Sequence, residues 1–224
     1  MDKKISIAID GPAAAGKSTV AKLIAKKLGF TYIDTGAMYR AFTYAVIKRN
    51  LDPQNEAQSC SIIGEVHIEL LPDGRVMCNG EDVSSIIRQP LVSGNVSYIA
   101  SYKQIRLALV ELQRKMAESS SIVMDGRDIG TYVLPNADVK IYQIASVETR
   151  AIRRYEENLS KGIPTTLKEV EEEVRNRDRI DSGRDFAPLK PAADSVLLDT
   201  SFMTVQEVVD KIIEIIKEKT GIEI

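Results

Sequence analysis

The sequence predicts an α/β fold: a five-stranded parallel sheet covered by helices on both faces, with a small antiparallel β insert and a helical lid. Three observations predict it. Short, nearly continuous apolar runs recur along the chain, as expected for strands buried on both faces. Segments with helical apolar spacing alternate with these runs, which is typical of a parallel sheet. At about residues 60–90 the chain instead shows strand-length pieces separated by strong turn signals.

The apolar runs begin near the N-terminus with ISIAID, which leads directly into a glycine-rich loop and a helix. In that helix Val20, Leu23, Ile24 and Leu28 recur at helical spacing, and Gly29 is placed as a C-cap. The expected strands are residues 5–10, 31–34, 121–126, 139–145 and 196–199.

The middle of the chain predicts two helices and the antiparallel insert between them. The first helix covers residues 37–49 and stops near Asn50 to Pro53. Within the insert, Asn79-Gly80 suits a tight hairpin turn. The second helix, residues 105–118, carries one apolar stripe. Its members are Ile105, Leu109, Leu112 and Met116.

Two later helices each begin with a capping box, Thr166 to Glu169 and Thr204 to Glu207. The earlier one has few apolar residues, so it is expected to be weakly held and mobile. The last helix is far more apolar and is expected to dock on the core. Its apolar residues are Val205, Val208, Val209, Ile212, Ile213 and Ile216.

The composition is that of an ordinary globular protein. The 224 residues are 44% hydrophobic and 28% charged, and the net charge is −2. This favours one domain, residues 1–224, and gives no overall attraction to nucleic acid or to a membrane. No apolar run approaches the roughly 18 residues of a membrane span, and the N-terminus does not resemble a signal peptide, so we expect a cytoplasmic location. Cys60, Cys78 and His67 form no zinc-binding pattern.

The strongest motif is GPAAAGKS, residues 11–18, which fits the P-loop pattern GxxxxGK[ST] between a strand and a helix. Glycines let backbone N–H groups surround phosphate oxygens, Lys17 reaches the β- and γ-phosphates, and the Ser18 hydroxyl binds Mg²⁺. Asp125, at the end of a buried strand, is a candidate to order Mg²⁺-bound water; a plain strand-end aspartate is the alternative. The predicted ATP-binding residues are Gly11, Pro12, Ala13, Ala14, Ala15, Gly16, Lys17, Ser18 and Thr19.

Arginines gather in a second region, at about residues 150–185. Arg150, Arg153 and Arg154 share one helix face, and RNRDRIDSGRD follows at residues 175–185. Phosphoryl transfer to an anionic acceptor needs cations around both ligands, so this region is expected to be a lid. The alternatives are a solvated loop whose charges cancel, and neutralisation of the helix face by Glu156 and Glu157.

Four motifs in order, IDGPAAAGKST, DTGAMYR, DGRDIGT and RDRIDSGRDFAPLKPAADS, resemble those of the bacterial cytidylate kinases, a family of nucleoside-monophosphate kinases. The likeness spans nearly the whole chain, including the antiparallel insert. It implies that Thr35, Tyr39 and Arg40 lie in the acceptor site, with Arg40 on the CMP phosphate.

The resemblance further implies that Ser97, Arg106 and Asp128 recognise cytosine. It places Arg177, Asp181 and Arg184 on the lid side, where the arginines approach phosphate and Asp181 faces the sugar. Asp178, Arg179 and Asp185 are left to balance charge and cap the loop. For Arg127, a paired structural arginine and a phosphate contact stay open. The expected catalytic residues are Lys17, Arg40, Arg127, Arg154 and Arg177, and the expected Mg²⁺ site is Ser18 with Asp125.

These observations together predict a monomeric enzyme that transfers the γ-phosphoryl group of ATP to CMP or dCMP. A P-loop kinase for another small acceptor, such as UMP or a non-nucleotide metabolite, is the nearest alternative. An ATP-binding protein that transfers no phosphate is the alternative from another class. The chain lacks the NKxD base-reading motif of GTPases and the LSGGQ-like signature of transporter ATPases.

Overall fold

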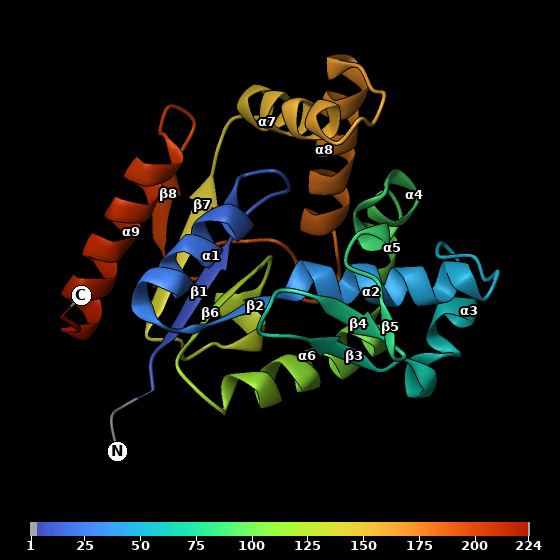
Figure 1. Ribbon diagram of the computed structural model, residues 1–224, viewed down its shortest axis with the longest axis horizontal. Coiled ribbons are helices and arrows are strands. Elements are labelled where there is room, and N and C mark those ends of the chain that lie inside the picture. Colours follow the sequence, from blue (N-terminus) through green and yellow to red (C-terminus); the bar gives the residue numbers. More distant parts are fainter. Residues whose placement is uncertain (1–3, 224) are drawn as a thin grey trace. The chain divides into compact units, whose positions relative to one another are not determined.

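The computed structural model describes residues 4–223, and the chain forms two compact units (Figure 1). One unit consists of residues 1–32 and 120–224, and the other of residues 33–119. The predicted insert, at about residues 60–90, lies within the second of these. Among residues 4–223, no helix combines the length and the apolar character needed to cross a membrane.

The large sheet has the strand order β2-β6-β1-β7-β8. Strand β1 pairs in parallel with both β6 and β7, and β7 pairs in parallel with β8. All the predicted strands are confirmed, with ends shifted by one residue at most. The strands are β1 (Ser6–Asp10), β2 (Thr31–Asp34), β6 (Ile122–Gly126), β7 (Val139–Ile144) and β8 (Val196–Asp199).

Helices α1 (Lys17–Leu28) and α9 (Val205–Thr220) share one apolar core with β1, β6 and β7 (Figure 1). Helix α1 ends as predicted, because Gly29 takes the left-handed conformation with φ 68°. The loop predicted to bind phosphate, residues 11–16, connects β1 to α1 at this core.

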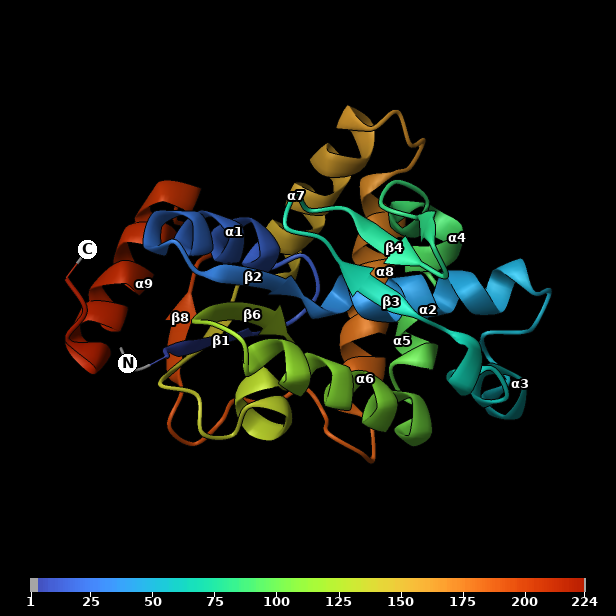
Figure 2. The ribbon, with the colours of Figure 1, turned by 60° about the horizontal axis from the view of Figure 1, so that its bottom comes forward.

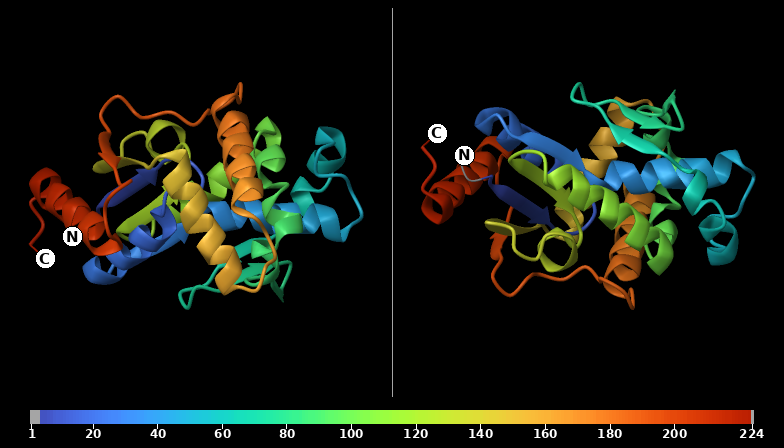
Figure 3. Two further views of the ribbon diagram at one scale, coloured as in Figure 1. Left: turned by 90° about the horizontal axis from the view of Figure 1, so that it is seen from above. Right: turned by 90° about the horizontal axis from the view of Figure 1, so that it is seen from below.

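Helices α7 (Val147–Ser160) and α8 (Leu167–Ser182) pack against each other (Figure 3). Both capping boxes, at Thr166 and Thr204, are confirmed by reciprocal hydrogen bonds. Helix α8 continues to Ser182, so most of the charged run RNRDRIDSGRD is helical. The interpretation of this run as a solvated loop is therefore wrong.

The second unit is built around α2 (Thr35–Lys48), which packs against a three-stranded antiparallel sheet (Figure 2). Helix α2 begins two residues before the predicted start because the Asp34 carboxylate accepts a hydrogen bond from the Ala37 N–H at 2.7 Å. The small strands are β3 (Ile68–Leu70), β4 (Val76–Cys78) and β5 (Glu81–Asp82). The remaining helices of this unit are α3 (Glu56–Cys60), α4 (Pro90–Ser93), α5 (Val96–Ile99) and α6 (Lys103–Ala117), with short 3₁₀ turns at Ile63–Glu65 and Ile86–Arg88.

Candidate active site

The loop between β1 and α1 has the conformation of a phosphate cradle. Gly11 has φ 149°, and a Cβ there would lie 1.9 Å from the backbone oxygen of Gln143. Gly16 has φ 89°, again a region that favours glycine. The Gln143 side chain donates to the Ala15 carbonyl at 2.5 Å and so fixes the loop from β7. The two glycines of the motif are thus required by the backbone path itself.

Lys17 opens α1 and folds back over this loop. Its ammonium donates to the Pro12 carbonyl at 2.7 Å, and the residue is 5% exposed. Burial, followed by the nearby charge of Arg127, lowers the pKa of Lys17 well below its usual value. A cation held this way, with little water around it, interacts strongly with an entering anion.

Ser18 and Asp125 are brought together as the sequence suggested. The Ser18 hydroxyl donates to Asp125 at 2.8 Å, and the Tyr32 hydroxyl donates to the other carboxylate oxygen at 2.6 Å. One hydroxyl and one carboxylate are hard oxygen ligands that suit Mg²⁺, which in kinase sites takes most of its ligands from water and phosphates. Within residues 4–223 no group of three or more His, Cys, Asp or Glu side chains could hold a metal ion.

Arg127 follows β6 and forms an ion pair with Asp181 of α8, with 2.9 Å between Nε and the carboxylate. Burial alone would raise the pKa of Asp181, but the charges of Arg127, Arg184 and Arg177 keep it below the usual value. Of the two roles left open for Arg127, the paired one is therefore present in this structure. Asp181, expected to face the sugar, is engaged with Arg127.

Arg150 is the residue of this region whose importance the sequence understated. It is 4% exposed and donates to the Ala13 carbonyl of the P-loop at 3.0 Å and to the Ala145 carbonyl at 2.9 Å. Its guanidinium also lies 2.7 Å from Asp178 of α8. Asp178 is thus a specific partner and does not merely balance charge. The shared helix face of Arg150, Arg153 and Arg154 was the signal that could have identified it.

Arg154 and Arg177 leave part of their guanidinium groups unsatisfied. Arg154 pairs with Glu157 at 3.1 Å, as the sequence allowed, and Arg177 lies 3.7 Å from Glu173. In each arginine the buried Nε has no hydrogen-bond partner among residues 4–223. Burial, followed by the charge of Arg127, lowers the pKa of Arg177 to about 10. Cations that are desolvated and held near other cations in this way are suited to bind a multiply charged anion.

The other predicted residues of this unit are also buried. Asp128 is 4% exposed and stands between β6 and the π-helical segment Ile129–Val133, labelled η3. Arg184 is 7% exposed, and its Nε donates to the Asp181 carbonyl at 3.0 Å. The first unit therefore collects the P-loop, the Ser18–Asp125 pair, and the arginines and aspartates of α7 and α8.

In the second unit, Arg40 and Arg88 both approach Asp34. The guanidinium of Arg40 lies 3.4 Å from the Asp34 carboxylate and that of Arg88 lies 3.9 Å away. Arg88 was not among the predicted residues, and no pattern in its sequence neighbourhood singles it out. Two guanidiniums around one carboxylate leave the group formed by Arg40, Arg88 and Asp34 with a net positive charge.

The remaining residues of the second unit that the sequence predicts for the acceptor site are buried. The Arg106 guanidinium lies over the Tyr39 ring, 5.3 Å from its centroid, and donates to the Ala100 carbonyl at 2.8 Å. Thr35 and Ser97 are each 3% exposed. Arg106 is thus held rigidly by an aromatic face and a carbonyl, as a recognition group requires.

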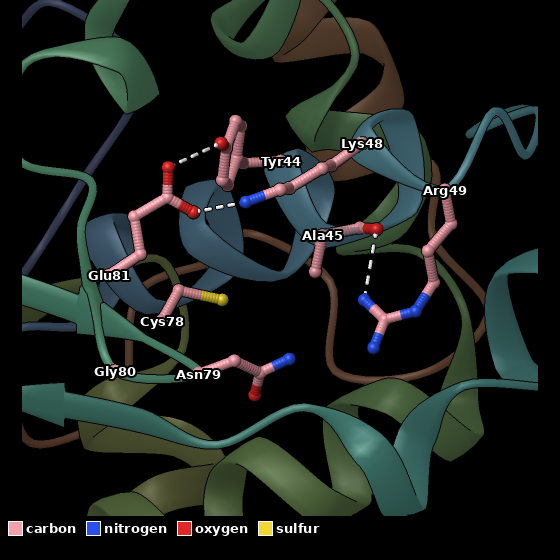
Figure 4. Close-up of a pocket in the computed structure, with 8 residues that line it drawn as sticks. All are labelled: Tyr44, Ala45, Lys48, Arg49, Cys78, Asn79, Gly80 and Glu81. Atoms are coloured by element: carbon pink, nitrogen blue, oxygen red, sulfur yellow. Dashed lines mark hydrogen bonds and ion pairs between the residues drawn. The ribbon is translucent and has the colours of Figure 1, made fainter.

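A cavity of about 490 Å³ lies elsewhere in the second unit, between α2 and the β4–β5 hairpin (Figure 4). Its lining contains none of the predicted site residues. Glu81 accepts hydrogen bonds from Tyr44 at 3.0 Å and from Lys48, and Arg49 donates to the Ala45 carbonyl. Since these polar groups pair with one another, nothing in the cavity indicates a ligand.

Comparison with known proteins identifies relatives over the full length. The chain matches the family model for cytidylate kinase over residues 7–218. It is 53% identical over 224 residues to a cytidylate kinase of Geobacillus thermodenitrificans (strain NG80-2), covering 99% of this chain and 100% of the relative. It is 51% identical over 222 residues to a cytidylate kinase of Anoxybacillus flavithermus (strain DSM 21510 / WK1), covering 98% and 99%.

Among solved structures, an uncharacterized protein from Eubacterium ventriosum ATCC 27560 aligns with a TM-score of 0.55. The alignment covers 96% of this chain and 99% of that one at 14% sequence identity. A likeness at this identity concerns the fold alone.

Proposed function

This chain belongs to the cytidylate kinase family, and we propose that it transfers the γ-phosphoryl group of ATP to CMP or dCMP, giving ADP and CDP or dCDP. The observation that carries the proposal is the concentration of Lys17, Arg127, Arg154 and Arg177 in one unit with the P-loop. A protein that only binds ATP has no need of a second set of half-buried cations. A phosphotransferase does, because negative charge from donor and acceptor meets at the transferred group.

The phosphate chain of ATP is assigned to the backbone N–H groups of residues 11–19 and to Lys17. The Pro12 carbonyl holds Lys17 in place until phosphate replaces it as partner. Arg154 and Arg177 are assigned to the transferred group, since their unsatisfied Nε–H groups can donate hydrogen bonds to the negative charge that develops there. No covalent intermediate is needed, because positioning and charge stabilisation suffice for such transfer.

Ser18 and Asp125 are assigned to Mg²⁺, Ser18 directly and Asp125 through a bound water. A bound Mg²⁺ would neutralise the β- and γ-phosphates of ATP. The present hydrogen bond between the two side chains keeps both oxygens close together. The Tyr32 hydroxyl orients the Asp125 carboxylate from the other side.

On the acceptor side, Arg40 is assigned to the CMP phosphate, together with Thr35 and Tyr39. Ser97 and Arg106 are assigned to the base. Asp181 and Arg184 are assigned to the sugar and phosphate on the lid side. This last assignment requires Asp181 to loosen its ion pair with Arg127 when nucleotide binds. We also propose that the enzyme is a cytoplasmic monomer.

Asp128 is assigned to the selection of the base. A carboxylate accepts hydrogen bonds from the N4 amino group of cytosine, whereas uracil presents a carbonyl oxygen at that position. Placing a hydrogen-bond acceptor of the ligand against a buried carboxylate costs about 1.5–3 kcal/mol. This corresponds to a roughly 10- to 150-fold lower kcat/KM. We therefore expect kcat/KM to favour CMP and dCMP over UMP by at least about tenfold.

The experiment is a coupled assay of ADP release with CMP, dCMP, UMP or no acceptor. Asp128→Asn should lower the ratio of kcat/KM for CMP to that for UMP, because the asparagine amide can donate a hydrogen bond to the O4 oxygen of uracil. The matched control is Asp185→Asn, a change at an exposed aspartate of the run RNRDRIDSGRD. It should leave the ratio of kcat/KM for CMP to that for UMP unchanged. ADP release without any acceptor would instead favour an ATPase, and an equal loss for CMP and UMP in Asp128→Asn would make Asp128 structural.

A further inference from the structure

Asp10, the last residue of β1, makes a pair of hydrogen bonds that span the sequence. One carboxylate oxygen accepts from the Ile129 N–H at 2.8 Å and the other from the Gly130 N–H at 2.7 Å, although 119 and 120 residues separate the partners. The side chain is 4% exposed. Asp10 therefore fixes the start of the π-helical segment Ile129–Val133.

This contact replaces a bond that a helix usually makes for itself. The first N–H groups of a helix are normally capped by the side chain of the N-cap residue, and aspartate is among the best caps. Here the N-cap residue is Asp128, and its side chain makes no capping hydrogen bond. By contrast Asp34, Ser146 and Thr166 each cap the helix that follows them. Asp10 supplies the cap from a neighbouring strand, so the Asp128 carboxylate is not used for this purpose.

Lys140 of β7 also packs against this segment, at Gly130. A Cβ at Gly130 would lie 3.1 Å from Cδ of Lys140 and 3.5 Å from a carboxylate oxygen of Asp10. Lys140 cannot easily move aside, because its ammonium donates to the Pro135 carbonyl at 2.6 Å and to Asp194 at 2.8 Å. The backbone at Gly130, two residues after Asp128, is thus packed against two anchored side chains.

The electrostatics of Asp10 agree with this role. Burial raises the pKa of the Asp10 carboxyl to about 7, against the N–H groups of Gly130 and Ile129, which lower it. The nearby charge of Asp128 raises it further, and that of Lys17 lowers it. Burying this carboxylate costs desolvation energy, which the two backbone hydrogen bonds partly offset. Its neighbours connect it both to the phosphate-binding lysine and to Asp128.

We propose that Asp10 is a positioning residue for acceptor selectivity: by capping the segment that follows Asp128 from the adjacent strand, it holds Asp128 in the orientation that reads the pyrimidine. This inference rests on the proposed function, in which Asp128 selects cytosine. Asp10 itself touches no substrate. Its effect is transmitted through the backbone at residues 128–130.

The test is a double-variant cycle on Asp10→Asn and Asp128→Asn, with kcat/KM measured for CMP and UMP and KM measured for ATP. An asparagine at position 10 keeps one acceptor and turns an N–H₂ group toward the second backbone N–H, so the cap is broken at constant size. We expect the CMP-to-UMP ratio of Asp10→Asn to fall roughly five- to tenfold, while KM for ATP changes less than about threefold. The ratio in the double variant should equal that of Asp128→Asn alone, because both changes act on one interaction.

The proposal is overturned if Asp10→Asn lowers kcat/KM for CMP and for UMP by the same factor. It is also overturned if the effects of the two single variants on the CMP-to-UMP ratio of kcat/KM multiply in the double variant. If Asp128→Asn narrows the ratio and Asp10→Asn does not, the positioning role fails while the proposed function stands. If neither variant narrows it, the assignment of Asp128 itself fails. Should Asp10→Asn not fold, Asp10→Ser, which also keeps one acceptor, takes its place in the cycle with the same expected outcomes.

Discussion

Helices α8 and α9 form a matched pair within one unit, yet they are held in opposite ways. Each has 16 residues and begins with a threonine–glutamate capping box. Helix α9 buries six apolar side chains, whereas α8 buries only Val170 and Val174 together with Asp181. The buried residues of α9 are Val208, Val209, Ile212, Ile213, Ile215 and Ile216.

What replaces apolar contact in α8 is charge. Asp178 pairs with Arg150 at 2.7 Å, and Asp181 pairs with Arg127 at 2.9 Å. Buried ion pairs add little net stability, because desolvation offsets most of the attraction. Their partners can nevertheless be exchanged for the phosphates of a ligand. The core helix α9 is thus held by buried apolar area, whereas α8, the predicted lid, is held by ion pairs for which a polyanion can compete.

Substitutions in the two helices should differ most in their effect on the stability of the protein. Ile212→Ala in α9 should lower the free energy of unfolding by about 2–5 kcal/mol, the usual cost of a cavity at a fully buried isoleucine. Val174→Ala in α8 should cost about 2 kcal/mol or less, since fewer methyl groups are lost and α8 can adjust. Urea unfolding of both variants gives the two values. A larger loss of unfolding free energy in Val174→Ala than in Ile212→Ala would contradict this contrast between the two helices.

The second effect separates them by activity. Arg177→Ala in α8 should lower kcat roughly 10²- to 10³-fold, the range for loss of a group that stabilises transferred charge. Lys211→Ala in α9 removes a cation that lies beside Glu214 at 2.6 Å and should leave kcat unchanged. Initial rates with saturating ATP and CMP, alongside melting curves of both variants, provide the measurement. Near-normal turnover in Arg177→Ala would remove this arginine from the catalytic set.

The smallest effect concerns motion. When a bisubstrate analogue carrying both nucleotides binds, amides of Leu167–Ser182 should exchange with solvent about tenfold more slowly or better, because the ligand orders the weakly held helix. Amides of Val205–Thr220 should change little beyond the global stabilisation that any ligand confers. Hydrogen exchange followed by mass spectrometry resolves the two segments. Equal protection gains in both would contradict a lid at α8.

Local signals in the sequence predicted most of the fold. The five strands, the P-loop and both capping boxes were predictable because each depends on residues a few positions apart. Ser18 and Asp125 were predictable as a pair because parallel strands end at one edge of the sheet. The π-helical segment Ile129–Val133 was missed, since its five residues are too short to show a period.

Apart from Ser18 and Asp125, contacts between distant residues were the part that the sequence could not predict. Nothing near Asp10 indicates that it caps Ile129 and Gly130, and nothing near Arg150 indicates that it joins the Ala13 carbonyl to Asp178. In both cases a charged residue in a local pattern looked like a strand end or a solvated helix face. The partners of Asp10 and Arg150 can be identified only from the folded structure.

The concentration of Arg127, Arg154 and Arg177 has a consequence for how the protein responds to salt. Like charges raise the energy of the resting state: the pKa of Arg177 is lowered first by burial and then by the charges of Arg127 and Arg154. Added ions partly screen that repulsion, so moderate ionic strength should favour the nucleotide-free fold while it weakens the attraction for phosphate. Stability and substrate affinity therefore respond to ionic strength with opposite signs, and the same three guanidiniums set both.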